Sequence, residues 1–387
     1  MGVDVSLEVQ VVESKKQWKQ FFDLRRTIYR DDPNAVFPLR FMERSMLDTE
    51  KHPFYQHAIR QPFLCLKNGQ PVGRIVAVKD HLHNEHYSDK VGFFGFFESP
   101  DDQSIADALL NEARKWLRAH GCDTMRGPVN PSMKADFGVL VQGHHDPPFI
   151  MMAHTPAYYQ RLLHSAGLET VRTFNAYLYD KPKTIKDAQG KTPDLLAVRE
   201  KILKKYPQIT FASATKANLE STLKKINLIG NEIRSEGWGF VPMTEAELNF
   251  MVKQVKRVIR PEMVMVAWWE GEVAGYIVCV PDINWALQRA KGKADWIRLP
   301  QFLYWMQKTN RTRLIAVGAQ KKYRKRGIGT LLSIQMHLIG VDLTSQFDYW
   351  EFSWIDAENI ASIRNMQRTI PCEHHKTLHL YEQPLSE

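Results

Sequence analysis

Residues 314–332, with the sequence LIAVGAQKKYRKRGIGTLL, constrain the fold of this chain more than any other segment. A short apolar run leads into a basic turn that contains Gly327 and Gly329, and an amphipathic pattern begins directly after the turn. Glycine lets the backbone approach a ligand closely, and the first N–H groups of a helix have no partner within the helix. The helix dipole also favours an anion at that end. The segment therefore predicts a strand, a turn and a helix that together bind a diphosphate.

Two other phosphate-binding loops do not match this segment. A P-loop needs Lys-Ser or Lys-Thr after its last glycine, and the dinucleotide-binding fingerprint needs three glycines and a later acidic residue. The pattern present is Arg324-x-x-Gly327-x-Gly329. A solvated basic loop would produce the same run of charges, so the neighbouring segments have to decide. We predict that the ligand-binding residues of this loop are Lys322, Arg324, Lys325, Arg326, Gly327, Ile328, Gly329 and Thr330.

The composition indicates a globular protein with more than one domain. The chain has 387 residues, of which 44% are hydrophobic and 25% are charged, and this length suffices for two domains with separate cores. A net charge of +9 favours acidic ligands or anionic surfaces. We do not expect nucleic acid to be the partner, because the sequence has no zinc-finger spacing, no aromatic RNA-binding signature and no basic region followed by heptads.

The expected location is the cytoplasm. The four cysteines are widely spaced, as free thiols are in a reducing compartment. The start of the chain shows no signal-peptide pattern, and no apolar run is long enough to span a membrane. Peripheral contact with the inner membrane stays an open alternative.

Two hairpins suggest an internal duplication. NGQPVGRIVAV in the first half aligns with EGEVAGYIVCV in the second, and each begins at a turn that ends in glycine. We predict two domains, 1–180 and 201–387, joined by a polar linker at 181–200. In the first copy the acidic segment 98–103 stands where the second copy has its basic loop. We therefore predict that only the second copy binds an anionic cofactor.

The segments after the loop extend the pattern. An alternating aromatic strand at 348–354, a helix at 356–365 and a strand at 374–381 follow in that order. Over 265–381 the chain resembles the GCN5-related N-acyltransferases, whose Arg/Gln-x-x-Gly-x-Gly/Ala loop binds the pyrophosphate of coenzyme A. The resemblance implies an α/β (α+β) fold with tandem domains, each a mixed, mostly antiparallel central sheet flanked by helices.

The resemblance also implies roles for single residues. Ile315 and Val317, on the strand before the loop, would bond the pantetheine arm, and the backbone near Val317 would stabilise the oxyanion. Asn359 matches the Asn that commonly begins the second helix. The family often has a Tyr seven residues later to protonate the thiolate, but this chain has Met366. Tyr381, water, or departure of the unprotonated thiolate are the alternatives.

Acyl transfer to an amine also requires a base. The first candidate is Glu351, which strand alternation places on the same face as Ser353 and opposite its aromatic neighbours. The alternative is that Glu351 is an ordinary solvent-facing strand residue. Asp356 and Glu358 are weaker candidates, because acidic residues in the first turn of a helix also favour its dipole.

Two stretches of the first half, RGPVNPS and MMAHTPAYY, combine proline turns with polar side chains. Loops on a rigid scaffold often carry binding groups. Asn130, His154 and Tyr158 are therefore candidates for the acceptor site, although a structural turn and core contacts would also explain them. The three histidines in HLHNEH at 81–86 suit a polar loop better than a zinc site, and we predict no metal.

Segments spread over the whole chain resemble a tandem group of bacterial proteins that includes the ceramide synthases. These segments are RFMERSMLD, HPFYQHA, GFFGFFES, RGPVNPS and WGFVPMTEAEL. The resemblance implies an N-acyltransferase that moves an acyl group from acyl-CoA to a primary amine, with a sphingoid or other lipid amine as the suggested acceptor. The alternatives are an acetyltransferase of a small amine or amino acid, and a non-catalytic module that binds acyl-CoA. A coenzyme A thioester is the implied co-substrate.

Overall fold

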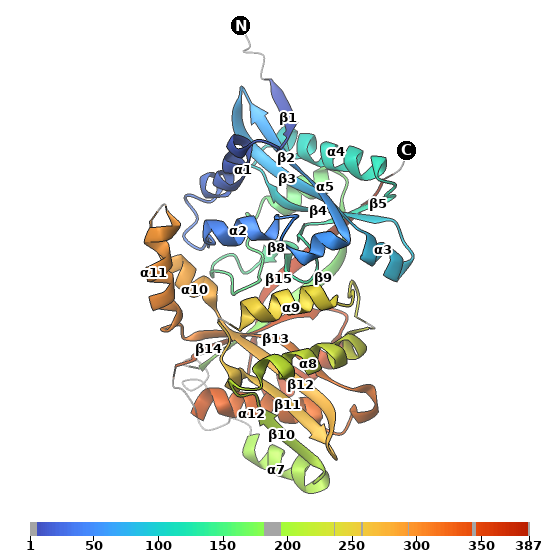
Figure 1. Cartoon of the computed structure of the whole chain (residues 1–387), viewed down its shortest axis with the longest axis vertical. Coiled ribbons are helices and arrows are strands. Elements are labelled where there is room, and N and C mark those ends of the chain that lie inside the picture. The colour runs from blue at the N-terminus through green and yellow to red at the C-terminus, as the bar shows by residue number, and fades with distance from the viewer. Residues whose placement is uncertain are drawn as a thin grey trace. The chain divides into compact units, whose positions relative to one another are not determined.

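The computed structural model describes residues 6–181, 195–235, 237–256, 258–292, 294–342 and 346–385, with the side chains of 339–342, 368 and 369 left aside. Most of the predicted linker at 181–200 lies outside the described residues. The chain forms two compact units (Figure 1). The first contains residues up to Thr173, residues 294 and 295, and residues from Lys376 onward, and the second contains Phe174–Gly292 and Trp296–His375.

The first unit is a sheet with helices packed against it. Its elements are β1 (Leu7–Val11), α1 (Lys15–Ile28), α2 (Arg40–Met46), η1 (Pro53–Gln56), β2 (Ala58–Lys67), β3 (Gln70–Asp80), α3 (His81–Tyr87), β4 (Val91–Glu98), α4 (Gln103–Ala119), β5 (Thr124–Gly127), β6 (Val129–Asn130), β7 (Asp136–Phe137), β8 (Val139–Gln142), α5 (Tyr159–Ser165) and β15 (Glu373–Pro384). The strand order is β1-β2-β3-β4-β5-β15, and β8 also pairs with β15. β4 and β5 are parallel, whereas the pairs on either side of them are antiparallel.

The second unit repeats this plan. Its elements are β9 (Glu169–Asp180), α7 (Leu195–Lys205), β10 (Ile209–Ser213), α8 (Leu219–Arg234), α9 (Glu245–Val255), η2 (Pro261–Met263), β11 (Val264–Trp269), β12 (Glu272–Pro281), α10 (Ile283–Arg289), α11 (Asp295–Met306), β13 (Arg311–Ala319), η3 (Lys321–Tyr323), α12 (Ile328–Asp342), β14 (Tyr349–Asp356) and α13 (Ile360–Thr369). The strand order is β9-β14-β13-β12-β11-β10, with β13 and β14 parallel. The predicted mixed, mostly antiparallel sheet with flanking helices is confirmed.

Local chemistry explains the two hairpins. The turns between β2 and β3 and between β11 and β12 place both central residues at positive φ: Asn68 and Gly69 at 51° and 74°, and Glu270 and Gly271 at 50° and 84°. This backbone twist matches the twist of the flanking strands. The histidine segment at 81–86 is a helix, α3, and not the predicted loop. It forms because the carboxylate of Asp80 accepts the first free N–H groups of the helix.

Each unit is completed by a strand from the other half of the sequence. β9 follows the last helix of the first half, yet its residues from Phe174 to Asp180 pair with β14 of the second unit. β15 follows the last helix of the second half, yet it pairs with β5 and β8 of the first unit. Leu378, Leu380 and Tyr381 of β15 are buried there. The predicted boundaries, which assign all residues after 200 to one domain, differ from the two units at this strand.

Candidate functional site

The candidate site lies where two parallel strands of the second unit separate. The pairing of β13 with β14 ends at Leu314 and Phe352. The next residue, Ile315, forms a bulge against β12, the neighbour on the other side. Val317, two residues further on, is 42% exposed. The backbone of β13 from Ile315 to Val317 therefore has no partner strand on its β14 side among the described residues.

The basic loop after β13 is anchored to the hairpin formed by β11 and β12. The hydroxyl of Tyr323 donates to Oε2 of Glu272 at 2.7 Å, and the ammonium of Lys322 pairs with the same carboxylate. The guanidinium of Arg326 lies over the ring of Trp269, 4.3 Å from its centroid. Lys322 and Arg326 thus hold the loop in place, and the exposed side chains of Arg324 and Lys325 are the other cations of the predicted set.

The start of α12 leaves donors available beside this loop. Leu331 N–H donates to the carbonyl of Gly327 at 2.8 Å, so the amides of Ile328, Gly329 and Thr330 precede the first bond of the helix ladder. A Cβ atom placed on Gly329 would meet no atom within 4 Å. These amides, the helix dipole and the open space at Gly329 are the features that an anion site requires.

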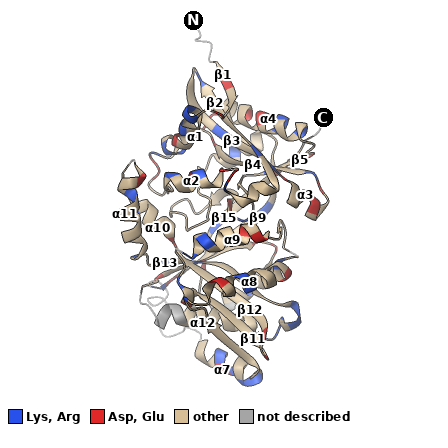
Figure 2. Ribbon diagram, in the orientation of Figure 1, with Lys and Arg blue, Asp and Glu red and all other residues tan. Residues whose placement is uncertain are grey.

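Helix α7 adds positive charge next to the loop. Ile202 of α7 lies against Gly327, since a Cβ on that glycine would be 2.9 Å from Ile202 Cγ2. Nε of Arg199 donates to Oε1 of Gln335 on α12 at 3.1 Å. Lys and Arg recur along α7 (Figure 2). Sequence reasoning missed this helix, because α7 begins in the segment interpreted as a linker.

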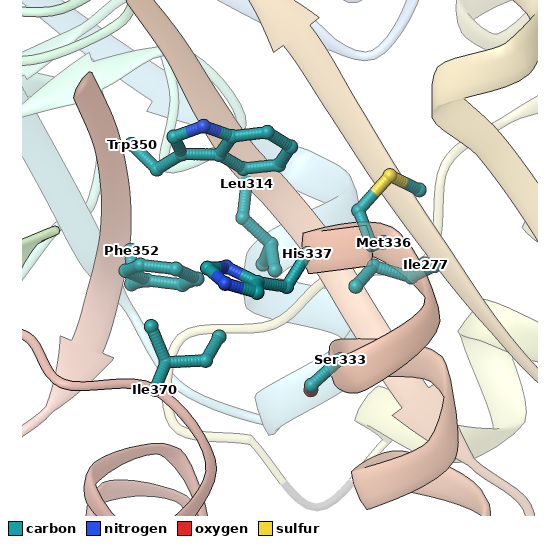
Figure 3. A pocket seen from close by; sticks show the side chains of 8 residues that line it. All are labelled: Ile277, Leu314, Ser333, Met336, His337, Trp350, Phe352 and Ile370. Carbon is teal, nitrogen blue, oxygen red and sulfur yellow. The ribbon is translucent and has the colours of Figure 1, made fainter. Parts of the chain in front are cut away.

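An apolar pocket lies between α12 and the two separating strands (Figure 3). Its cavity volume is about 10 Å³, roughly the space that one water molecule needs. Trp350 and Phe352 enter it from β14, and His337 enters it from α12. Burial lowers the pKa of His337, which favours the neutral imidazole. The full lining is Ile277, Leu314, Ser333, Met336, His337, Trp350, Phe352 and Ile370.

On the opposite face of β14, a buried polar cluster surrounds Glu351. Its Oε1 accepts the O–H of Ser353 at 2.7 Å, and its Oε2 lies 3.3 Å from Nδ1 of His375. Nε of Arg313 donates to Ser353 Oγ at 2.8 Å and lies 3.7 Å from Glu351 Oε1. Arg313 and Glu351 are paired across the strands one residue before the pairing ends. The cluster therefore stands beside the point where β13 and β14 separate.

Glu351 is held in its ionised form. Burial alone would raise the pKa of this carboxyl, but hydrogen bonds from His375 and Ser353 and the charge of Arg313 outweigh burial, and the pKa is lowered. The side chain is completely buried, so the solvent-facing alternative is wrong. A carboxylate of lowered pKa is a weak base, whereas it is well suited to hold the N–H of a neighbouring imidazole.

The remaining predicted residues of the second half separate into two groups. Asn359 caps α13, since its Oδ1 accepts the N–H of Ser362 at 3.1 Å. The hydroxyl of Thr330 donates to Oδ1 of Asn365 on α13 at 2.9 Å. Thr330 on α12 and Asn359 at the start of α13 therefore lie on the two helices on the side of the basic loop. Tyr381 is fully buried in the core of the first unit. The fold therefore does not bring Tyr381 into the second unit with the other candidates.

The three acceptor candidates all lie in the first unit, and each makes an internal contact. Oδ1 of Asn130 accepts the N–H of Phe96 at 2.6 Å. Nε2 of His154 lies 2.7 Å from a carboxylate oxygen of Asp32, and burial lowers the pKa of this imidazole. Tyr158 donates to a backbone carbonyl at 2.9 Å. These contacts match the structural explanation that the sequence left open.

The equivalent strand gap of the first unit is filled by its own chain. Phe96 has a φ of 49° at a bulge in β4. Its backbone N–H donates to the side-chain oxygen of Asn130. A Cβ on the neighbouring Gly95 would lie 1.7 Å from the carbonyl oxygen of Val129. At the start of α4, the carboxylate of Asp102 accepts the N–H of Ser104 at 3.0 Å. A residue of the chain thus occupies the place where a bound anion would sit.

Sequence reasoning did not identify Arg313 and His375 as site residues, and it noted Ser353 only as a residue on the same strand face as Glu351. A single arginine in an apolar strand and a serine in an aromatic strand give little signal alone. Arg313 lies two residues before Ile315, so alternation places the two side chains on the same face of the strand. The side chains come from β13, β14 and β15, and single-sequence patterns do not show that these three strands come together.

The fold defines a class. Over its whole length, the chain resembles tandem GCN5-related N-acyltransferase (GNAT) structures. One is a tandem GNAT protein from the clavulanic acid biosynthesis pathway, with a TM-score of 0.56, 12% identity and coverage of 99% of both chains. A second similar structure is a GCN5-related N-acetyltransferase from Sphaerobacter thermophilus, with a TM-score of 0.53, 13% identity and coverage of 98% of this chain and 96% of that one. The predicted tandem GNAT fold is confirmed.

Sequence similarity defines the family within that class. The chain is 30% identical to the bacterial ceramide synthase of Caulobacter vibrioides over 395 aligned residues. The alignment covers 99% of each chain. The chain therefore belongs to the family of that protein. It is also 28% identical to protein YghO of Escherichia coli, over 97% of this chain and 95% of that one. No protein-family model matches the chain.

Within the described ranges, no three His, Cys, Asp or Glu side chains are grouped so that they could hold a metal ion. In the same part of the chain, no helix combines the length and the apolar character needed to cross a bilayer.

Proposed function

We propose that this protein is an acyl-CoA-dependent N-acyltransferase whose acceptor is the primary amine of a sphingoid or similar lipid. The observation that carries the proposal is the open helix start at Gly329, with free amides and basic neighbours, at the end of a strand that borders a gap in the sheet. The acceptor class follows from the relative of 30% identity, which is a ceramide synthase.

The second unit supplies the groups that would hold the coenzyme. The amides of Ile328, Gly329 and Thr330 would receive the diphosphate, and Lys325 and Arg324 would balance its charge. The free edge of β13 from Ile315 to Val317 would bond the pantetheine arm and offer an N–H to the developing oxyanion. The apolar pocket lined by Trp350 and Phe352 lies on the same side of the sheet as α12 and is too small to hold an acyl chain, so these side chains would form an apolar wall beside the thioester.

We assign the general base to His375 and a positioning role to Glu351. The amine nitrogen attacks the thioester carbonyl, the C–N bond forms, the C–S bond breaks, and the amine gives up a proton. Glu351 accepts the Nδ1–H of His375 in this assignment, so Nε2 is the basic nitrogen of the neutral imidazole and would take that proton. Water would protonate the thiolate, because Met366 has no proton to donate and Tyr381 lies in the core of the first unit.

The reaction test uses acyl-CoA of graded chain length, with and without amines, and follows the release of coenzyme A thiol. Thiol release with long-chain acyl-CoA and a sphingoid base, together with the N-acylated product in mass spectrometry, supports the proposal. Release only with acetyl-CoA and a small amine would instead support the acetyltransferase. Tight binding of acyl-CoA without turnover would identify a binding module.

Two substitutions separate the roles of His375 and Glu351. His375→Asn should lower kcat by about 10²–10⁴-fold, the usual contribution of a general base, with an unchanged Kd for acyl-CoA measured by calorimetry. Glu351→Gln keeps the shape and a hydrogen-bond acceptor but loses the charge, so it should lower kcat less. A variant His375→Asn that turns over at the wild-type rate would contradict the assignment and return the base to Glu351.

A further inference from the structure

Helix α11 in the second unit presents an exposed apolar face. Trp296 is 78% exposed, Leu303 48% and Tyr304 56%, and Leu299 is 37% exposed. These residues are spaced by three, four and eight positions, so they share one side of the helix. Side chains of this size are seldom left in water together on one helix face, which indicates a surface with a partner.

The other side of α11 fixes the helix to the second unit. Phe302 is 4% exposed and Arg298 is 2% exposed. Nε of Arg298 donates to the carbonyl of Ala290 at 3.0 Å, just after α10. Gln301 donates from its amide to the carbonyl of Lys291 at 3.0 Å. The helix is therefore held firmly, and its exposed apolar residues keep their positions on the second unit.

The charges around α11 are mostly positive. From residue 289 to 308 the sequence has a single acidic residue, Asp295. Nζ of Lys308 lies 5.7 Å from the ring centroid of Tyr304, and the guanidinium of Arg289 lies 3.6 Å from that of Trp285. Cations therefore stand next to aromatic rings at this surface. The basic residues that the structure places on the surface of this segment are Arg289, Lys291 and Lys308, whereas Arg298 is buried.

We infer that α11 is an interfacial helix that docks the protein on an anionic lipid bilayer, with Trp296, Leu303 and Tyr304 entering the boundary between headgroups and acyl chains. Trp and Tyr favour this boundary, and an apolar helix face with basic flanks is the usual composition of a surface-bound helix. A second copy of the chain would also cover an apolar face, but the surrounding cations of two copies would repel each other, whereas anionic lipid attracts them.

The biological meaning of this membrane inference rests on the proposed function, and the inference adds the surface on which that function would take place. A sphingoid acceptor has a long apolar tail and resides in the membrane, so an enzyme that acylates it gains access by binding that surface. Vesicle binding does not require catalysis. Failure of the membrane inference and failure of the proposed reaction are therefore distinguishable.

The test is co-sedimentation of the full chain with vesicles that contain phosphatidylglycerol, compared with vesicles of phosphatidylcholine alone. The variant Trp296→Ser/Leu303→Ser should lower the partition coefficient about tenfold or more, because each side chain loses its apolar burial. The matched control is Leu228→Ser, which removes a 71% exposed leucine from α8 and should bind as the wild type does. Added salt should weaken binding to the anionic vesicles.

Three outcomes would overturn the inference. The wild-type chain could fail to sediment with anionic vesicles, or the control could lose binding as strongly as the double variant. Sedimentation velocity could also show a wild-type dimer that the double variant dissociates, without vesicle binding, which would assign the face to a second copy. A double variant that keeps wild-type thiol release with a detergent-dispersed acceptor, but loses it with vesicle-borne acceptor, supports the inference.

Discussion

At the scale of single residues, the two glycines of the loop have different tasks. Gly327 has a φ of +80°, and a Cβ there would lie 2.9 Å from Ile202. It shapes the turn and allows α7 to pack against it. Gly329 instead keeps the space beside the helix amides open. A substitution at Gly327 would therefore disturb the fold, and Gly329 is the position that tests ligand binding alone.

We predict that Gly329→Glu weakens acyl-CoA binding at least about tenfold, because a carboxylate would stand in the diphosphate position. The same change should leave the melting temperature unchanged or slightly higher. Glutamate is a better helix residue than glycine and favours the helix dipole in the first turn. Calorimetry with the acyl-CoA and thermal unfolding of the free protein measure the two effects separately.

The control for this prediction is Gly329→Gln, which has the size of glutamate without its charge. It should retain more affinity than Gly329→Glu. Equal and unchanged affinities in both variants would show that the diphosphate does not bind at this helix start.

At the scale of elements, the sequence predicts the turns, strands and helices whose formation depends on neighbouring residues. The hairpin turns at Asn68-Gly69 and Glu270-Gly271, the strand at β14 and the helix after Gly327 all follow from periodicity and turn residues. The helix α3 was missed because its cap, Asp80, stands at the end of a strand pattern. The polar cluster around Glu351 was missed because His375 comes from a strand whose partners lie far away in the sequence.

The filled gap in the first unit gives a prediction at this scale. Asn130→Ala should destabilise the protein by about 1–3 kcal/mol, since the amide of Phe96 loses its acceptor inside the fold. Affinity for acyl-CoA should not change, because the cofactor loop belongs to the other copy. Thermal unfolding and calorimetry check both statements, with Gln70→Ala at an exposed strand end as the control. A large loss of acyl-CoA affinity would place the coenzyme against the first unit.

At the scale of the whole molecule, the exchanged strands are the feature that no sequence pattern could reveal. Alternation shows that 174–179 and 374–381 are strands, but the free edges of two similar sheets offer equal partners. Duplication suggests that each copy closes on itself. The pairing of β9 with β14 and of β15 with β5 shows that each copy is closed by the other.

We predict that removal of residues 376–387 unfolds the first unit, although most of that unit precedes residue 174. The deletion takes away the strand partner of β5 and the buried side chains of Leu378, Leu380 and Tyr381. Limited proteolysis should then cleave the region before Thr173 rapidly, whereas a chain that lacks only the last two residues should resist as the wild type does. Equal resistance of both truncated chains would contradict the prediction.

The exchange also sets the timing of biosynthesis. A ribosome releases the amino-terminal half long before it makes the strand that pairs with it, so β5 has an unsatisfied edge until β15 has been made. An edge of that kind invites chaperones or neighbouring chains. Nascent copies of this protein should therefore depend on protection during synthesis more than a chain whose domains close one after the other.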